Sequence, residues 1–218
     1  MKTVPPLPTR RLLIAGLAGL ALPAAAEPVR RVLAPMTEGP FYPPARWRAR
    51  EDDWDADLTR VRRSGAVSPA RGEHRDQRLV VVDTRGRAID GTEVEIWQCD
   101  ALAAYRHPSV AAEPGRFDPG FQGFGAARSA ADGGVAFRTI RPVPYPGRTP
   151  HIHVKLRHAS FGELTSQLFI AGDAGNARDF LWRAVAAAER PTLEMQLQPA
   201  AAGSDLRWTV RHALVVPA

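Results

Sequence analysis

Short runs of β-forming residues, separated by turn residues, dominate the chain from Arg78 onward. The run 79–82 is β-branched, and 92–97 alternates polar and apolar side chains with a period of two. Similar runs occur at 135–140, 151–156, 166–170, 192–197 and 206–216, with Gly and Pro clusters between them. Many short strands joined by turns are typical of a β-sandwich. We therefore expect an all-β fold, mainly an antiparallel β-sandwich, over residues 78–218, with one Ala- and Leu-rich helix near 176–189.

Two segments precede this domain. Residues 27–77 are predicted to be an irregular N-terminal arm, because prolines disfavour regular structure. Residues 1–26 have the features of an export signal peptide: basic residues, an apolar run at 12–22 and small residues at 24–26. This apolar run is shorter than the roughly 20 residues that span a membrane. We therefore expect no stable membrane anchor.

The basic residues of this signal include an arginine pair, in Thr9-Arg10-Arg11-Leu12-Leu13. That sequence resembles a twin-arginine signal, which carries proteins that have already folded. An ordinary Sec signal fits the same residues. Either route predicts an exported protein, periplasmic or extracellular.

The charge balance argues against a nucleic-acid partner. The formal net charge is +6, and removal of residues 1–26 takes away Lys2, Arg10 and Arg11 and no acid, which leaves +3. The arginines of 46–78 are interspersed with acids, as on a solvated surface. The single cysteine, Cys99, excludes an intrachain disulfide.

Four residues form a candidate metal site: Tyr105, Tyr145, His151 and His153. Side chains two apart on a strand point to the same face, so both imidazoles can reach one ion. By itself a His-x-His pair on a strand is more often incidental, and buried tyrosines are often only hydrogen-bonded core residues. Two phenolates with two imidazoles would be a hard, anionic donor set, which favours Fe(III).

Several motifs accompany these four residues. They are Thr-Glu-Gly-Pro-Phe-Tyr-Pro at 37–43, the strand 91–97 that leads to Asp100 and Tyr105, Phe-Gln-Gly-Phe-Gly at 121–125, Phe-Arg-Thr-Ile-Arg-Pro at 137–142, Tyr-Pro-Gly-Arg-Thr-Pro-His-Ile-His at 145–153, and Gln-Leu-Phe at 167–169. With this combination the chain resembles the intradiol ring-cleavage dioxygenases, of the protocatechuate 3,4-dioxygenase and catechol 1,2-dioxygenase type. The resemblance runs from Thr37 to about Asp173 and is weak over residues 45–77.

The resemblance implies a function and a set of roles. Tyr105, Tyr145, His151 and His153 match the four protein ligands of a non-haem Fe(III), and Tyr145 matches the tyrosine that leaves the iron when substrate binds. Arg148 matches an arginine beside the bound diol, and Gln167 matches a glutamine behind the ligands. The family cleaves the ring of a small aromatic diol between its two hydroxyl-bearing carbons. Both atoms of O2 enter the product, a cis,cis-muconate-type dicarboxylic acid.

The same resemblance implies two substrate contacts in the arm, Thr37 and Pro40. The chain departs from the family pattern at Ala103, Ala104, Ala126 and Val143. No departure removes a ligand, so these residues leave the identity of the catechol open. A homo-oligomer is compatible with the sequence.

Two other hypotheses fit parts of the pattern. A non-catalytic, transthyretin-like β-sandwich binding module would share the strands and need no Tyr/His set. A zinc or copper hydrolase would use the His-x-His pair, but the sequence provides no conventional third ligand for it.

Overall fold

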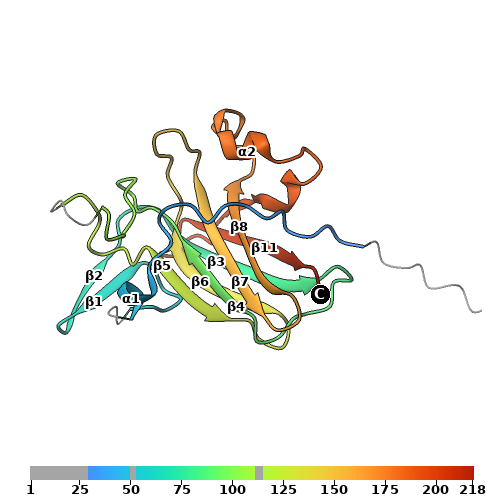
Figure 1. Cartoon of the computed structure of the whole chain (residues 1–218). Coiled ribbons are helices and arrows are strands. Elements are labelled where there is room, and N and C mark those ends of the chain that lie inside the picture. Colours follow the sequence, from blue (N-terminus) through green and yellow to red (C-terminus); the bar gives the residue numbers. More distant parts are fainter. Residues whose placement is uncertain (1–28, 50–52, 111–114) are drawn as a thin grey trace, which may run out of the picture.

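The computed structural model describes residues 29–49, 53–110 and 115–218, and strands are their main regular elements (Figure 1). The strands are β1 (Arg60–Arg63), β2 (Ala66–Pro69), β3 (His74–Asp83), β4 (Glu93–Trp97), β5 (Phe124–Arg128), β6 (Gly134–Ile140), β7 (His151–His158), β8 (Gly162–Ile170), β9 (Glu194–Met195), β10 (Leu197–Pro199) and β11 (Trp208–Val216). The helical elements are α1 (Ala45–Arg48), α2 (Phe180–Ala184) and the 3-10 turns η1 (Asn176–Arg178) and η2 (Arg190–Leu193).

Two sheets pack against each other as a sandwich. One has the order β10-β11-β3-β6 and the other the order β5-β4-β7-β8-β9. Their pairs are antiparallel except for β11 with β3 and β8 with β9, which are parallel. The predicted all-β, mainly antiparallel sandwich is confirmed.

The sandwich core follows from period-two alternation. On β7, Ile152, Val154 and Leu156 are fully buried and point into the core. Side chains from β3, β4, β6, β8 and β11 meet them in one continuous apolar cluster. Burial of such a cluster is the main favourable term in folding.

The other face of β7 is also buried, which is unusual for an antiparallel sheet. His151, His153 and Lys155 point to this outer face and are at most 4% exposed. The blue N-terminal segment in Figure 1 runs across it and covers it. Its backbone pairs with β8, since the Met36 N–H donates to the Thr165 carbonyl at 2.9 Å.

The residues predicted to form an irregular arm contain a hairpin. Strands β1 and β2 pair antiparallel across Ser64 and Gly65, which have φ values of 49° and 80°. Two successive positive φ values are those of the type I′ turn that best fits a two-residue hairpin. The arginine-rich strand β1 gave little hydrophobic alternation, so its pattern did not predict a strand.

The helix expected near 176–189 is much shorter in the structure. The 3-10 turn η1 and the five-residue helix α2 lie within its first nine residues, 176–184. Asp179 begins α2 by accepting the N–H groups of Leu181 and Trp182, and extended Val185 ends it. The run 192–197 is likewise divided between η2, β9 and β10.

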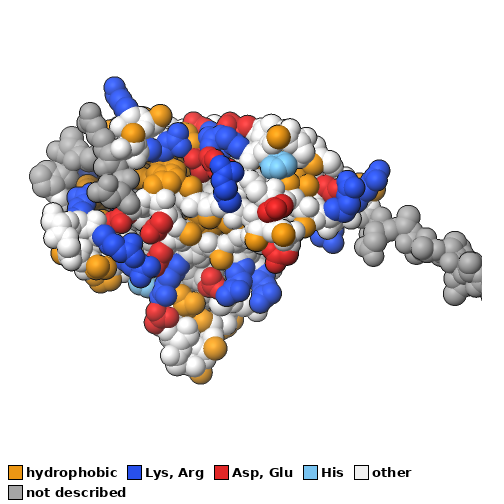
Figure 2. Space-filling view, turned by 90° about the horizontal axis from the view of Figure 1, so that it is seen from below, with side chains coloured by type: hydrophobic (Ala, Val, Ile, Leu, Met, Phe, Trp, Pro, Cys, Tyr) orange, Lys and Arg blue, Asp and Glu red, His pale blue; other side chains and the backbone are white. Residues whose placement is uncertain are grey.

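The predicted signal peptide, residues 1–26, lies outside the described residues. Within the described part, no helix is long and apolar enough to cross a membrane. Acidic and basic side chains are interspersed over the face that Figure 2 shows.

Arg75 is a cation buried in the sandwich interior. Its side chain is 0% exposed, and none of its three nitrogens has a hydrogen-bond partner among the described residues. Burial, with a contribution from the charge of Arg141, lowers its pKa to about 9. An unpaired buried charge is costly.

We therefore expect Arg75→Met to raise the free energy of unfolding by about 1–3 kcal/mol, measured by urea denaturation. Arg78→Met on the same strand is the control, because Arg78 is exposed and its replacement removes no buried charge. A less stable Arg75→Met protein would contradict this account of the core.

Candidate metal centre

Tyr105 is positioned by the loop that follows β4. Asp100 is 2% exposed, and its Oδ1 accepts the N–H groups of Leu102 and Ala104 at 2.8 and 3.0 Å. Its Oδ2 accepts the N–H of Asp118. These bonds fold the loop back on itself, with Ala103 at φ 62°, and direct Tyr105 into the interior.

Tyr145 and Arg148 are the two ends of one β-turn. The Arg148 N–H donates to the Tyr145 carbonyl at 2.9 Å, and Gly147 has φ 82°. Proline followed by a residue with positive φ is typical of a type II turn, which favours glycine at that position. The turn brings the side chains together, with Arg148 Nη1 3.4 Å from Tyr145 Oη.

The four predicted ligands converge. His151 and His153 lie on the same face of β7, and Tyr105 Oη is 3.4 Å from His151 Nε2 and 3.2 Å from His153 Nε2. Tyr145 Oη is 3.5 Å from His151 Nε2. Residues from a loop, a turn and a strand thus direct four N and O atoms at one small volume.

His151 has a defined tautomer. Its Nδ1 is 2.7 Å from the Thr149 carbonyl, which can only accept, so Nδ1 carries the proton and Nε2 is free to bind a metal. His153 differs. Its Nδ1 is buried and has no hydrogen-bond partner in the described part of the chain.

All four predicted ligands are neutral near pH 7 in the metal-free protein. Burial, followed by the charge of Arg148, lowers the pKa of His151 to about 4. Burial also lowers the pKa of His153 and raises the pKa of both tyrosines. A bound cation would reverse the effect on the phenols, because it stabilises phenolate.

The geometry fits a metal ion. Nitrogen and oxygen ligands about 2.1 Å from a common ion lie roughly 3–3.5 Å apart, as these atoms do. Two phenol and two imidazole groups are hard donors that suit Fe(III). No three His, Cys, Asp or Glu side chains within residues 29–49, 53–110 and 115–218 lie close enough together to hold a metal ion.

Arg148 is held rigidly beside this centre. Its Nε donates to Asp179 Oδ2 at 2.8 Å and its Nη2 to Gln167 Oε1 at 2.5 Å. The Gln167 amide in turn donates to the Thr37 carbonyl at 2.9 Å. The predicted residues Arg148, Gln167 and Thr37 are therefore one hydrogen-bonded chain that ends in the arm.

Asp179 also belongs to this site, although the sequence patterns did not single it out. It is buried, accepts the Thr149 N–H as well as Arg148, and caps α2. Although burial opposes it, these hydrogen bonds lower the pKa of Asp179, so the group is a carboxylate. An Asp directly before a helical run is an N-cap signal that could have drawn attention to it.

The arm lies over two of the predicted ligands, His153 and Tyr105. A Cβ at Gly39, where φ is 72°, would come within 3.3 Å of His153 Cε1. Phe41 stacks on Tyr105 with ring centroids 4.4 Å apart. Pro40 follows Gly39 directly and is exposed. The side chain of Thr37 is exposed, and it is its backbone carbonyl that reaches Gln167.

Tyr145 lines two cavities. One of about 600 Å³ also has Val143, Arg148 and Arg178 in its wall, and one of about 330 Å³ has Ala103 and Ala104. Three of the four departures from the family pattern therefore line these cavities. The fourth, Ala126, lies in β5 opposite Glu95.

Comparisons with known proteins agree on one family. A family model described as "Dioxygenase" matches residues 57–216. The chain is 34% identical over 134 residues to the protocatechuate 3,4-dioxygenase beta chain of Burkholderia cepacia, which covers 56% of this chain and 57% of that protein. It is 25% identical over 109 residues to the catechol 1,2-dioxygenase of Candida albicans, covering 42% of this chain and 34% of that protein. The chain thus spans 57% and 34% of the length of these two relatives.

Solved structures share the fold. The dioxygenase domain of a dioxygenase carbohydrate-binding protein fusion from Streptomyces sp. SirexAA-E has a TM-score of 0.62 and 25% identity, and covers 86% of this chain and 99% of that one. An intradiol ring-cleavage dioxygenase from Tetranychus urticae has a TM-score of 0.63 and 21% identity, and covers 86% and 95%.

The lowered pKa of His151 predicts acid sensitivity of the metal-free protein. The unfolded chain takes up the proton near pH 6.5, whereas the folded chain resists it until about pH 4. The contribution of His151 to the free energy of unfolding is therefore fully present above pH 6.5 and is lost as the pH falls toward 4. We expect His151 alone to account for roughly 2–3 kcal/mol between pH 7 and pH 4.5.

The measurement compares urea denaturation of the wild type and His151→Gln across this range. The variant should lose that part of the pH dependence. His158→Gln, on the half-buried histidine at the end of the same strand, should keep it. An unchanged slope in His151→Gln would show that the imidazole is not held neutral.

Proposed function

Since this chain belongs to the intradiol ring-cleavage dioxygenase family, we propose that it binds a non-haem Fe(III) and cleaves a catechol-type aromatic diol. One diol and one O2 would give one cis,cis-muconate-type dicarboxylic acid, with both oxygen atoms retained. The observation that carries this proposal is the convergence of Tyr105, Tyr145, His151 and His153 on one volume.

The four residues would hold the metal through two Oη and two Nε2 atoms. Fe(III) bound there would supply the centre that binds the diol and brings it to react with O2. Tyr105 is 5% exposed and covered by Phe41, which supports a permanent ligand role. Tyr145 is less buried and lines both cavities, which supports the role of the ligand that leaves.

Proton transfer can be assigned to the same tyrosine. A departing Tyr145 phenolate can take one proton from the incoming diol at its Oη. Arg148 Nη1 lies 3.4 Å from that oxygen, so a fixed cation stands where negative charge would develop on the substrate. We assign Gln167 and Asp179 the task of holding the guanidinium in this position.

Thr37 and Pro40 remain proposed substrate contacts, since the arm at Gly39 approaches His153. The protocatechuate and catechol relatives are covered only in part, so the particular catechol stays open.

We also propose export through the signal at residues 1–26, by the twin-arginine or the Sec route. Sequencing the N-terminus of the secreted protein tests this.

The function is tested by loading the purified protein with Fe(III) and assaying catechols for O2 uptake. Tyrosinate bound to Fe(III) absorbs visible light by charge transfer, so the protein should be burgundy. At least one of catechol, protocatechuate and hydroxyquinol should be opened between its hydroxyl-bearing carbons, as judged from the carbon skeleton of the product. A colourless protein at full iron occupancy would rule out the proposal.

Tyr145→Phe tests the role of the leaving ligand. The ring stays, so packing is preserved, but the oxygen that binds metal and accepts the proton is lost. We expect turnover to fall by about two orders of magnitude or more, while iron stays bound by the other three ligands. The matched control is Trp208→Phe, which removes a hydrogen-bonding group from an aromatic side chain of β11, in the sheet that does not carry the donor set. Wild-type turnover by Tyr145→Phe would refute its role.

A further inference from the structure

The two histidine ligands are oriented in different ways. His151 is fixed by the bond from its Nδ1 to the Thr149 carbonyl. Metal-binding histidines almost always use their second nitrogen in such a bond, which fixes the ring. His153 Nδ1 lacks this bond among the described residues, and the ring is nevertheless 2% exposed and aimed at the donor set. Some other contact must orient it.

That contact is Trp97. The indole lies parallel to the His153 imidazole, with ring centroids 4.8 Å apart and an interplanar angle of 11°. The two residues are directly opposite each other on β4 and β7, so the stack is a cross-strand pair. Trp97 Nε1 is itself buried without a partner in the described part of the chain. The indole is therefore held by ring packing alone.

Tyr42 of the arm packs against Trp97. Its ring meets the indole edge-on, at 4.9 Å and 67°. Its hydroxyl donates to Glu95 Oε2 at 2.6 Å and accepts from Arg157 Nη2 at 2.8 Å. Burial and the bond to Glu95 raise the pKa of Tyr42 to about 12, so it stays a phenol that can donate.

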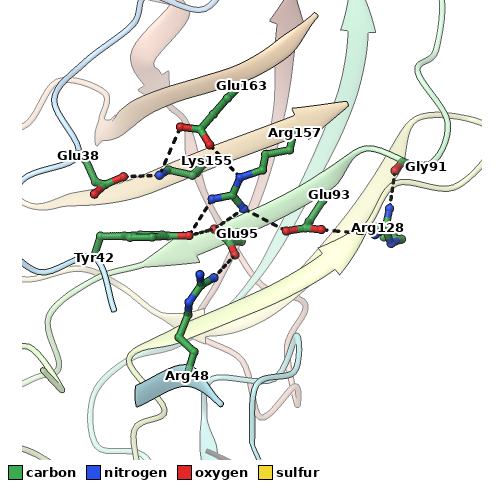
Figure 3. Close-up of polar contacts among 10 residues, drawn as sticks. All are labelled: Glu38, Tyr42, Arg48, Gly91, Glu93, Glu95, Arg128, Lys155, Arg157 and Glu163. Atoms are coloured by element: carbon green, nitrogen blue, oxygen red, sulfur yellow. Dashed lines mark hydrogen bonds and ion pairs between the residues drawn. The ribbon is translucent and has the colours of Figure 1, made fainter. Parts of the chain in front are cut away.

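A network of charged side chains surrounds this hydroxyl (Figure 3). Glu95 is 2% exposed and also accepts from Arg48 at 2.8 Å. Lys155 pairs with Glu38 of the arm, and its ammonium lies 4.0 Å from the centre of the Tyr42 ring. The arm is thus attached to the sheet at Glu38 and Tyr42, on either side of Gly39, where an added Cβ would lie 3.3 Å from His153 Cε1.

We propose that Trp97 is a positioning residue for the His153 ligand, and that Tyr42 with its charged network holds Trp97 in place. His153 would be kept in its metal-binding orientation by a face-to-face stack instead of a hydrogen bond. The effect on iron binding rests on the proposed function, whereas the orientation of the ring does not.

The experiment uses the full chain, metal-free and loaded with Fe(III), as wild type, Trp97→Leu, Trp97→Phe and Tyr42→Phe. In the metal-free protein, the ring C–H resonances of His153 should be a single set displaced by the indole ring current. In Trp97→Leu they should lose this displacement and broaden. With iron bound, release to a chelator should be about 10–100-fold faster in Trp97→Leu. Trp97→Phe should release iron at a rate much closer to that of the wild type. Tyr42→Phe should speed up iron release less than Trp97→Leu does.

Phe137→Leu is the matched control for lost packing, because Phe137 is a buried ring in the opposite sheet. It should lower the unfolding temperature and leave the His153 resonances and iron release as in the wild type. The proposal is overturned if Trp97→Leu leaves the resonances unmoved, or if Phe137→Leu releases iron as quickly as Trp97→Leu. A wild type that takes up no Fe(III) would refute the proposed function, while the resonances alone would still decide the role of Trp97.

Discussion

The structure depends on burial of both faces of β7. Period-two alternation directs Ile152 and Val154 into the sandwich and His151 and His153 to the outer face. A polar face can be buried only if its groups find partners, so the arm has to cover this side of the sheet with matching hydrogen bonds and charges. The candidate site is thus a second, polar-lined interior, separate from the core. Trp97, Cys99, Tyr105 and Phe124 form a small hydrophobic cluster of its own.

Much of this could be predicted from residue patterns. Strands β4, β6, β7 and β11 came from alternation and β-branched runs, which are local signals. The four proposed ligands came from strand geometry together with motif resemblance, and in the structure the donor atom of each lies within 3.5 Å of the donor atom of at least one other. Their roles as ligands stay predictions. The domain boundary at residue 78 was drawn from where alternation begins, and β3 extends back to His74.

What the patterns did not predict depends on contacts distant in sequence. The hairpin β1–β2 consists largely of exposed residues, with three arginines in β1, so it lacks the alternation of a half-buried strand. The Ala-rich stretch after Asn176 favours helix locally, but tertiary packing ends α2 after one turn. Trp97 was visible only as one residue in a strand, because its stacking partner lies 56 positions further on, across the sheet, at His153.

The charged network around Tyr42 fixes the position of the arm along the sheet. Desolvating Glu95 and Lys155 costs free energy that their pairing only partly recovers, so the network adds little net stability. It is satisfied, however, only when Glu38 meets Lys155 and the Tyr42 hydroxyl meets Glu95. A purely apolar arm could slide along the sheet at small cost. With both attachments made, Gly39 is the residue that faces His153, and glycine is required there because its φ is positive and a side chain would crowd the imidazole. The ion pairs therefore contribute to the site by fixing which arm residue lies over His153.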